Sequence, residues 1–282
     1  MSTRRVRDYV GEAPQIGSLP RAYGRLSEQL RNPNINLRAV AETVESDPAL
    51  TIQLMRLVNS ALLGPARQVG SIEEAVVRLG HRRLHELALA TNVVHMFRGL
   101  PEHLIDMESF WRHSIAVGLA ARMLAERHLA MPTDDLFVAG LLHDMGRLVL
   151  CVGHADVARS LLIRAENTQS PMQVVERVDI GIDHAKIGAQ LLKRWKLPTT
   201  LQVATEFHHN PSKAPTEVKT AAMVHLADIV ATSLEVGSSG ERVVPPMDVQ
   251  AMKLLGVRER MLVAVMDELD QRVEEIAGAL VH

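Results

Sequence analysis

The chain has 282 residues, more than most single domains, so we expect two packed sub-domains or one domain with a helical annex. Apolar residues make up 47% and aromatic residues only 3%, which favours helix-on-helix packing around an aliphatic, methionine-rich core. The formal net charge of −2, with both signs interspersed, argues against direct nucleic-acid binding.

The amino-terminal part of the chain carries clear signals for helix starts. Asp47 is a capping residue and is followed by Pro48, which is favoured at the first helical position. Ser71 and Glu74 form a capping box, in which the serine accepts the Glu74 amide and the glutamate reaches back to the Ser71 amide. The sequence therefore predicts helices that begin near residues 48 and 72.

Glycine and proline residues divide the rest of the chain into helices. Gly80 is expected to end or bend its helix, and a helix over about 81–97 then leads into a linker at 98–101. Further helices are expected at about 108–129, 134–150, 156–167, 172–178, 182–196, 199–209 and 215–236. Because period-two alternation of apolar residues is nearly absent, the sequence predicts an all-α fold.

The carboxy-terminal part begins with a flexible loop at 236–240 and ends in a long helix over about 258–280. The apolar residues of this helix alternate spacings of four and three: Leu262, Met266, Leu269, Val273, Ile276 and Leu280. Such a short coiled-coil-like seam is expected to pack against its own chain, and a homodimer is the alternative.

Two features bear on the compartment. The single cysteine, Cys151, lies in an apolar run, which predicts a buried and reduced thiol. No stretch of about eighteen uncharged apolar residues is present, and residues 1–10 lack the apolar segment of a signal peptide. We therefore expect a cytoplasmic protein that does not associate with membranes.

The sharpest local feature is the pair His143 and Asp144 in an otherwise apolar helix. A buried aspartate without a partner costs several kcal/mol, so this pair needs a partner, a metal or access to water. Neighbouring helix residues diverge by about 100°, so both side chains reach one metal only beside a helix end, where Gly146 relieves crowding.

Five more candidate ligands lie at or near helix ends or on apolar helices. With the first pair, the set is His113, His143, Asp144, His184, His208, His209 and Asp228. Imidazoles with one or two carboxylates suit Fe, Mn, Zn or Ni, and an aspartate that bridges would allow two ions. The alternative is that these histidines are ordinary hydrogen-bonded core residues.

The order of these ligands resembles that of the HD-type phosphohydrolases, especially the HD-GYP branch, which hydrolyses cyclic dinucleotides. Two features depart from that branch. Asn210 and Pro211 follow the paired histidines where the branch has an acidic residue and a Gly-Tyr-Pro loop, and Arg147 replaces its motif lysine. Arginine binds phosphate well but does not readily donate a proton, so Arg147 is a candidate phosphate-binding residue and the lysine-assisted step is in doubt.

Several other motifs resemble the HDOD family, a relative of the HD phosphohydrolases that acts in bacterial signalling. They are residues 46–51, 57–61, 71–75 with 79–80, 181–184, 191–192, Trp195 and 197–198, all in the family's order within about 14–232. The resemblance implies a multi-helical two-lobed fold, with a groove between the lobes. We expect an amino-terminal lobe at 1–100, an HD-like lobe at 101–236 and a carboxy-terminal helical extension at 237–282.

The resemblance also implies the function. We expect a regulatory or output module that binds signalling proteins or a nucleotide-like small ligand and carries a vestigial metal site. The alternative is a metal-dependent phosphohydrolase that acts on nucleotides or cyclic dinucleotides, in which Arg147 neutralises phosphate charge. The retained ligands favour the enzyme, whereas the missing loop and lysine favour the regulatory module.

Overall fold

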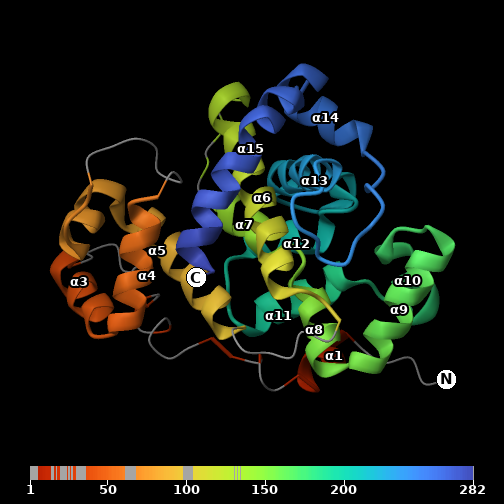
Figure 1. Cartoon of the computed structure of the whole chain (residues 1–282), viewed down its shortest axis with the longest axis horizontal. Coiled ribbons are helices and arrows are strands. Elements are labelled where there is room, and N and C mark those ends of the chain that lie inside the picture. Colours follow the sequence, from red (N-terminus) through yellow and green to blue (C-terminus); the bar gives the residue numbers. More distant parts are fainter. Residues whose placement is uncertain are drawn as a thin grey trace. The chain divides into compact units, whose positions relative to one another are not determined.

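The computed structural model is all-α throughout the residues that it describes, with helices joined by loops (Figure 1). These residues are 6–13, 16, 18–19, 24, 26, 28–29, 36–60, 68–97, 104–129, 131, 133 and 135–281. The chain divides into two compact units, one formed by Met1–Ser18 and Leu100–Asp270 and the other by Leu19–Gly99 and Gln271–His282. The linker predicted at 98–101 lies outside the described residues, and the three-part domain division stays a prediction.

The smaller unit contains α3 (Leu37–Glu45), α4 (Pro48–Val58) and α5 (Ile72–Met96), and α4 packs against both of the others. The Asp47 carboxylate caps α4 by accepting the amides of Ala49 and Leu50, as the sequence predicts. The Ser71 hydroxyl caps α5, but the Glu74 carboxylate accepts the Gly70 amide at 2.8 Å instead of the predicted Ser71 amide.

Gly80 lies inside α5 and bends it. Its φ of 75° and ψ of 165° are non-helical, and the helix continues on both sides of this kink. A positive φ of this kind is readily adopted only by glycine. The predicted end or bend at Gly80 is therefore confirmed as a bend.

The larger unit carries the candidate site and most of the helices that the structure describes. They are α1 (Val6–Gly11), α6 (Met107–Leu124) with a π-helical turn at Ala125–Leu129, α7 (Leu136–Leu142), α8 (Met145–Gly153), α9 (Ala155–Thr168), α10 (Met172–Asp179), α11 (His184–Arg194), α12 (Thr199–Phe207), a 3-10 turn at Pro211–Lys213, α13 (Val218–Ser233), α14 (Val249–Leu255) and the first part of α15 (Glu259–Leu280). Helix α6 packs against α7 and α13, and α11 packs against α8 and α12.

The amino-terminal segment belongs to this larger unit because it packs on α8 and α11. The indole N–H of Trp195, at the end of α11, donates to the Ile16 carbonyl at 3.0 Å. His154, after α8, donates from Nε2 to the Tyr9 carbonyl at 3.0 Å. These two bonds fasten residues 9 and 16 to helices that lie more than 130 residues later in the sequence.

Two glycines allow α6 and α7 to cross in close contact. A Cβ on Gly118 of α6 would lie 2.5 Å from the Phe137 carbonyl oxygen, and one on Gly140 of α7 would lie 2.4 Å from the Gly118 nitrogen. Real Cβ atoms do not approach backbone atoms so closely. This crossing positions His113, five residues before Gly118, and His143, three residues after Gly140, for contact at the site.

One helix prediction is wrong, because the helix is interrupted. The segment expected as a single helix over 134–150 is two helices, α7 and α8, separated at His143 and Asp144. Asp144 has φ −100° and ψ 13°, outside the helical values, and Gly146 packs directly on the His184 carbonyl. The break lets two consecutive side chains face the same place, which a continuous helix does not allow.

Burial refines three further expectations. In the seam of α15, Leu262, Leu269, Val273, Ile276 and Leu280 are buried within the single chain, but Met266 is half-buried and Val265 is buried instead.

Cys151 is half-buried rather than buried, and burial raises the pKa of its thiol to about 12, so the thiol stays protonated. One stretch, Leu136–Gly153, is apolar and long enough to span a membrane, but 83% of it is buried inside the chain.

Candidate metal centre

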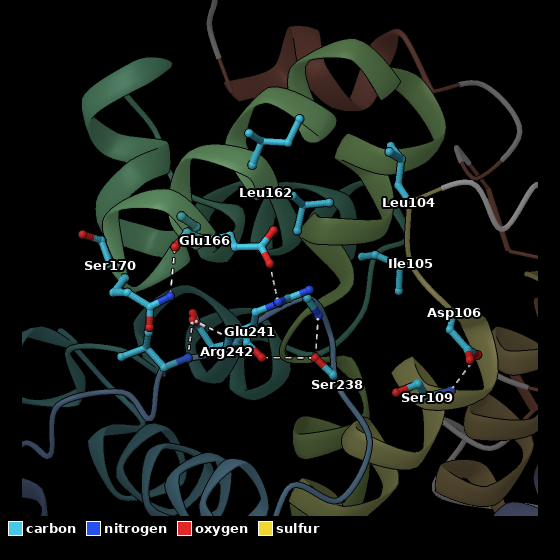
Figure 2. Close-up of a pocket in the computed structure, with 15 residues that line it drawn as sticks. Leu104, Ile105, Asp106, Ser109, Leu162, Glu166, Ser170, Ser238, Glu241 and Arg242 are labelled. Carbon is cyan, nitrogen blue, oxygen red and sulfur yellow. Dashed lines mark hydrogen bonds and ion pairs between the residues drawn. The ribbon is translucent and has the colours of Figure 1, made fainter.

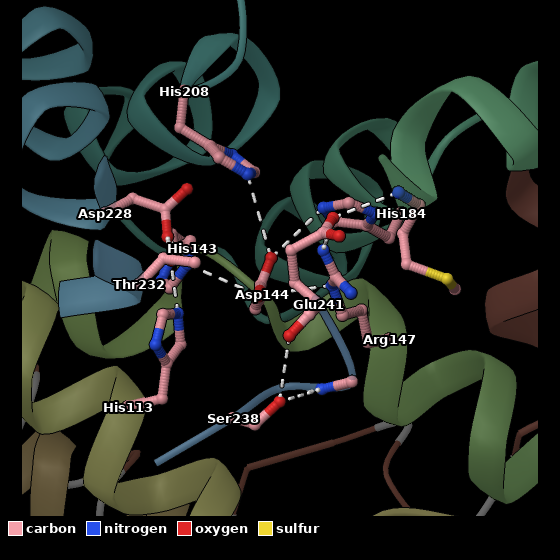
Figure 3. Close-up of polar contacts among 12 residues, drawn as sticks. His113, His143, Asp144, Arg147, His184, His208, Asp228, Thr232, Ser238 and Glu241 are labelled. Atoms are coloured by element: carbon pink, nitrogen blue, oxygen red, sulfur yellow. Dashed lines mark hydrogen bonds and ion pairs between the residues drawn. The ribbon is translucent and has the colours of Figure 1, made fainter. Parts of the chain in front are cut away.

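The seven predicted ligands come together in the larger unit, and all except His209 are labelled in Figure 3. They arise from separate places: His113 on α6, His143 and Asp144 at the break between α7 and α8, His184 at the start of α11, His208 and His209 after α12, and Asp228 on α13. Each of the seven side chains is buried, the most exposed being His209 at 7%. The predicted convergence in space is therefore found, whereas a ligand role stays a prediction.

The first group of contacts surrounds Asp228. Its Oδ1 lies 3.3 Å from Nε2 of His113 and 3.8 Å from Nε2 of His143. The Thr232 hydroxyl, one helical turn further along α13, donates to the same carboxylate oxygen at 3.2 Å. Asp228 is thus oriented toward two imidazoles by its own helix.

The second group of contacts surrounds Asp144, which lies between His143 and His184 in Figure 3. Its Oδ2 is 3.4 Å from Nε2 of His143. Its Oδ1 is 3.1 Å from Nε2 of His184 and 3.7 Å from Nε2 of His208. Because its two oxygens face different histidines, Asp144 has the geometry expected of a carboxylate that bridges two ions.

The donor atoms gather into three trios, each within 4.8 Å: His113, His143 and Asp228; His143, Asp144 and His208; His184, His208 and His209. Ligand bonds of roughly 2 Å place two ligand atoms of one ion up to roughly 4 Å apart, so small side-chain movements complete each trio. Nitrogen with carboxylate oxygen is the donor set of Fe, Mn, Zn and Ni sites.

Hydrogen bonds to the Nδ1 atoms leave the Nε2 atoms pointing inward. Nδ1–H of His143 donates to the Gly140 carbonyl and Nδ1–H of His208 to the Thr205 carbonyl, each at 2.7 Å. Within the described part of the chain, Nε2 of His113, His143 and His208 makes no hydrogen bond. Metal-binding histidines are usually held in this way, with the second ring nitrogen bonded to a carbonyl or carboxylate. The residues present therefore fit a metal ion.

His184 is held by a buried carboxylate that the sequence did not single out. Glu176 on α10 accepts both the His184 amide, at 2.8 Å, and its Nδ1–H, at 2.6 Å. Burial lowers the pKa of His184, but the charges of Glu176 and Asp144 and the hydrogen bond to Asp144 together outweigh burial and raise the pKa to about 9. A metal ion that takes Nε2 of His184 must therefore displace a proton.

The other pKa shifts follow from burial and neighbouring charge. Burial and the nearby His143 lower the pKa of His208 to about 3, and burial and the nearby His208 lower the pKa of His209 well below its ordinary range. Both imidazoles are therefore neutral, the form that binds metals. Burial opposes ionisation of Asp144, but the charges of Arg147 and His143 hold its pKa well below the usual value.

Arg147, the predicted phosphate-binding residue, is already engaged by carboxylates of the chain. Its Nε lies 3.1 Å from Asp144 Oδ2, and its Nη2 donates to Glu241 Oε2 at 3.3 Å. The guanidinium is buried, and burial lowers its pKa less than Asp144 and Glu241 raise it. Its Nε and Nη2 can therefore bind a phosphate only if one of these partners moves.

Three supporting residues were missed because no local pattern marks them. Glu176 and Glu241 become partners of the centre only through tertiary contact. His225 on α13 donates from Nδ1 to the His208 carbonyl at 2.7 Å and accepts the Asp248 amide at 2.8 Å through Nε2. It therefore holds the backbone beside two predicted ligands, although it is not one itself.

The chain matches the model of a known protein family. The profile of the HDOD domain matches residues 16–211, which is well over half of the chain. An uncharacterized protein from Treponema pallidum (strain Nichols) is 28% identical over 216 residues, covering 76% of this chain and 41% of that protein. The chain thus spans less than half the length of this curated relative.

Solved structures give the same fold. A Shewanella amazonensis SB2B protein provisionally named a phosphohydrolase is 28% identical, with a TM-score of 0.77 and 99% coverage of both chains. An HDOD domain protein of unknown function from Geobacter sulfurreducens is 25% identical, with a TM-score of 0.75 and 98% coverage of both. A Marinobacter aquaeolei VT8 protein provisionally named for signal transduction is 25% identical, with a TM-score of 0.74, and covers 94% of this chain and 59% of its own.

Proposed function

The chain belongs to the HDOD domain family, and we propose that it is a cytoplasmic signal-transduction module whose histidine and aspartate cluster holds divalent transition-metal ions without being a hydrolase. The ligands of these ions are His113, His143, Asp144, His184, His208, His209 and Asp228. Its output is the binding of partner proteins or of a nucleotide-like small ligand. The match to the family and the solved signal-transduction relative support this direction.

The proposal depends on one observation: all seven predicted ligands come together, but they are buried and the cation beside them is already paired. The Nε2 atoms face one another in a buried cluster, which supports metal binding. Arg147, a cation beside the cluster, already contacts Asp144 and Glu241 through Nε and Nη2, so these two donors are not free to bind a phosphodiester. Turnover needs an open coordination position and groups that orient the substrate, whereas holding an ion needs only the ligands.

The number of ions is part of the proposal. The three trios overlap through His143 and His208, and Asp144 presents one oxygen to His143 and the other to His184. This arrangement supports two neighbouring ions better than one. When bound, such ions supply positive charge and Lewis acidity to the enclosed site, and they add to the folding free energy of the larger unit.

The test is metal content and phosphodiesterase turnover of protein purified without a histidine tag, in Fe, Mn and Ni buffers. Asp144→Ala should lose most of the bound metal, whereas Asp47→Ala, which removes a helix cap in the other unit, should lose stability but keep its metal. The parent should hydrolyse cyclic dinucleotides negligibly. Robust turnover by the parent that is lost in Asp144→Ala would overturn the proposal in favour of a hydrolase. Absence of metal from the parent would show that the histidines are ordinary core residues.

The second candidate is a metal-dependent phosphohydrolase, and two observations favour it. The ligand set is complete, and the Shewanella amazonensis relative that shares 28% identity over nearly the whole chain is provisionally named a phosphohydrolase. In that function Arg147 would have to exchange Glu241 for a substrate phosphate. The turnover assay above separates the two candidates.

A further inference from the structure

The segment 236–244, here called the strap, follows α13 and presses on the first turns of α6. Gly237 has a φ of 65°, and a Cβ there would lie 2.3 Å from the Ser109 carbonyl oxygen and 2.6 Å from the His113 nitrogen. The Ser238 amide donates to that same Ser109 carbonyl at 3.0 Å. The strap therefore touches the backbone of a predicted ligand, although it lies beyond the residues 16–211 that match the family.

The strap is fastened at its other end by the buried carboxylate of Glu241. One oxygen accepts the amides of Arg242 and Val243, at 3.1 and 3.2 Å. The other accepts the Met172 amide of α10 at 3.0 Å and Nη2 of Arg147 at 3.3 Å. Glu241 is thus an anion in a site built from three backbone amides and one guanidinium.

Arg147 is poorly satisfied by this anion. Charge-assisted N–H···O bonds are usually about 2.7–2.9 Å long, so the 3.3 Å contact with Glu241 is a weak one. Among the described residues, nothing accepts a hydrogen bond from its Nη1, although the side chain is buried. A phosphate offers more acceptor oxygens and can bind a guanidinium through two parallel bonds. The site is therefore better suited to a phosphate than to the carboxylate that now fills it.

Two cavities are lined in part by the strap, and Ser238, Glu241 and Arg242 line both of them. The one in Figure 2 holds about 270 Å³, and the other holds about 300 Å³ and reaches His113. Pockets for small ligands usually hold about 300–1,000 Å³, so each cavity alone is at the lower limit. Glu241, which lines both cavities, also contacts Arg147.

We propose that Glu241 is an internal anion that closes a site for a phosphate-bearing small ligand. The ligand's phosphate takes Arg147, Glu241 leaves, and the strap loosens so that the two cavities become one. The inference rests on the proposed metal binding, because the carboxylates of Asp144, Asp228 and Glu176 near Arg147 disfavour an added anion unless metal charge offsets them. Ligand binding then releases the strap. The strap thus has two states, held and released, as a signalling module needs.

The experiment titrates inorganic phosphate into the Mn-loaded full chain by calorimetry. Glu241→Gln keeps the shape of the side chain but removes its charge, so it should bind phosphate at least about tenfold more tightly than the parent. Glu166→Gln is the matched control, because Glu166 lines the same cavity but pairs with Arg242 and not with Arg147. Equal phosphate affinity in the parent and Glu241→Gln, or an equal gain in both variants, would overturn the inference.

A second measurement needs no variant. The amides of Met172, Arg242 and Val243 donate to Glu241, so their hydrogen exchange reports directly on its release. Phosphate should speed exchange at all three in the Mn-loaded parent and leave it unchanged in the metal-free chain. A parent that holds no metal refutes the proposed function and this inference with it. A parent that holds metal and binds phosphate without faster exchange at Met172 refutes the inference alone.

Discussion

Replacement of Gly146 by alanine tests whether the close packing of α8 on α11 builds the metal centre. A Cβ at this position would lie 1.9 Å from the His184 carbonyl oxygen and 2.7 Å from the Gly188 nitrogen. Ordinary contact begins at 3.4 Å, so the two helices must separate by about 1.5 Å. Overpacking of this kind costs about 1–3 kcal/mol of unfolding free energy. It also separates Asp144 from His184, whereas metal ligands tolerate only about 0.2 Å.

The assay is urea unfolding of Gly146→Ala in chelator and in excess metal, with metal content measured in parallel. In chelator, the unfolding free energy of the variant should be about 1–3 kcal/mol lower than that of the parent. In excess metal the difference should be larger, because the variant no longer gains the free energy of metal binding. Gly278→Ala on α15 is the matched control, since nothing lies within 4 Å of its Cβ and alanine favours helices by up to about 1 kcal/mol. Unchanged stability and metal content in Gly146→Ala would refute the reasoning.

Three smaller predictions concern Asp248 and Thr232. Asp248 caps α14, so Asp248→Ala should lower the urea-unfolding free energy by about 1 kcal/mol. Burial raises the Asp248 pKa, but the hydrogen bonds from Ser212, Gln250 and Ala251 together outweigh burial, so the folded pKa is depressed. The difference between parent and variant should therefore be complete above about pH 5 and vanish as the pH falls through the folded pKa, as pH-dependent unfolding can measure. Thr232→Val removes the hydroxyl that orients Asp228, so metal titration should show about 10–100-fold weaker binding with nearly unchanged metal-free stability.

Features set by neighbouring residues could be predicted from the sequence. The cap at Asp47 and the bend at Gly80 depend on groups within three residues, so the local pattern was sufficient for both. The convergence of His113, His184 and Asp228 has a different origin, because nothing in their spacing brings three distant helices together. It was predicted through the resemblance to a known ligand order, and the match to the HDOD profile supports that route.

Features that depend on tertiary packing could not be predicted. The break at His143 and Asp144 lies in an apolar segment with helical periodicity, and it forms where α8 packs closely on α11 at Gly146. Glu241 lies 94 residues from Arg147 in a loop of ordinary composition, so its burial gives no sequence signal. The same holds for Glu176, whose pattern is that of any polar residue on an amphipathic helix until His184 is placed against it.

Arg147 connects the two proposals physically. Its guanidinium lies between Asp144, a proposed ligand, and Glu241, the anchor of the strap. A divalent ion at Asp144 offsets the negative charge that now attracts Arg147 and adds repulsion of its own. Arg147 then depends more on the anion at its other end, where Glu241 makes only a 3.3 Å contact. Bound metal should therefore increase the affinity of Arg147 for a phosphate. A module that does not hydrolyse its ligand can then still respond to both the metal ion and the phosphate.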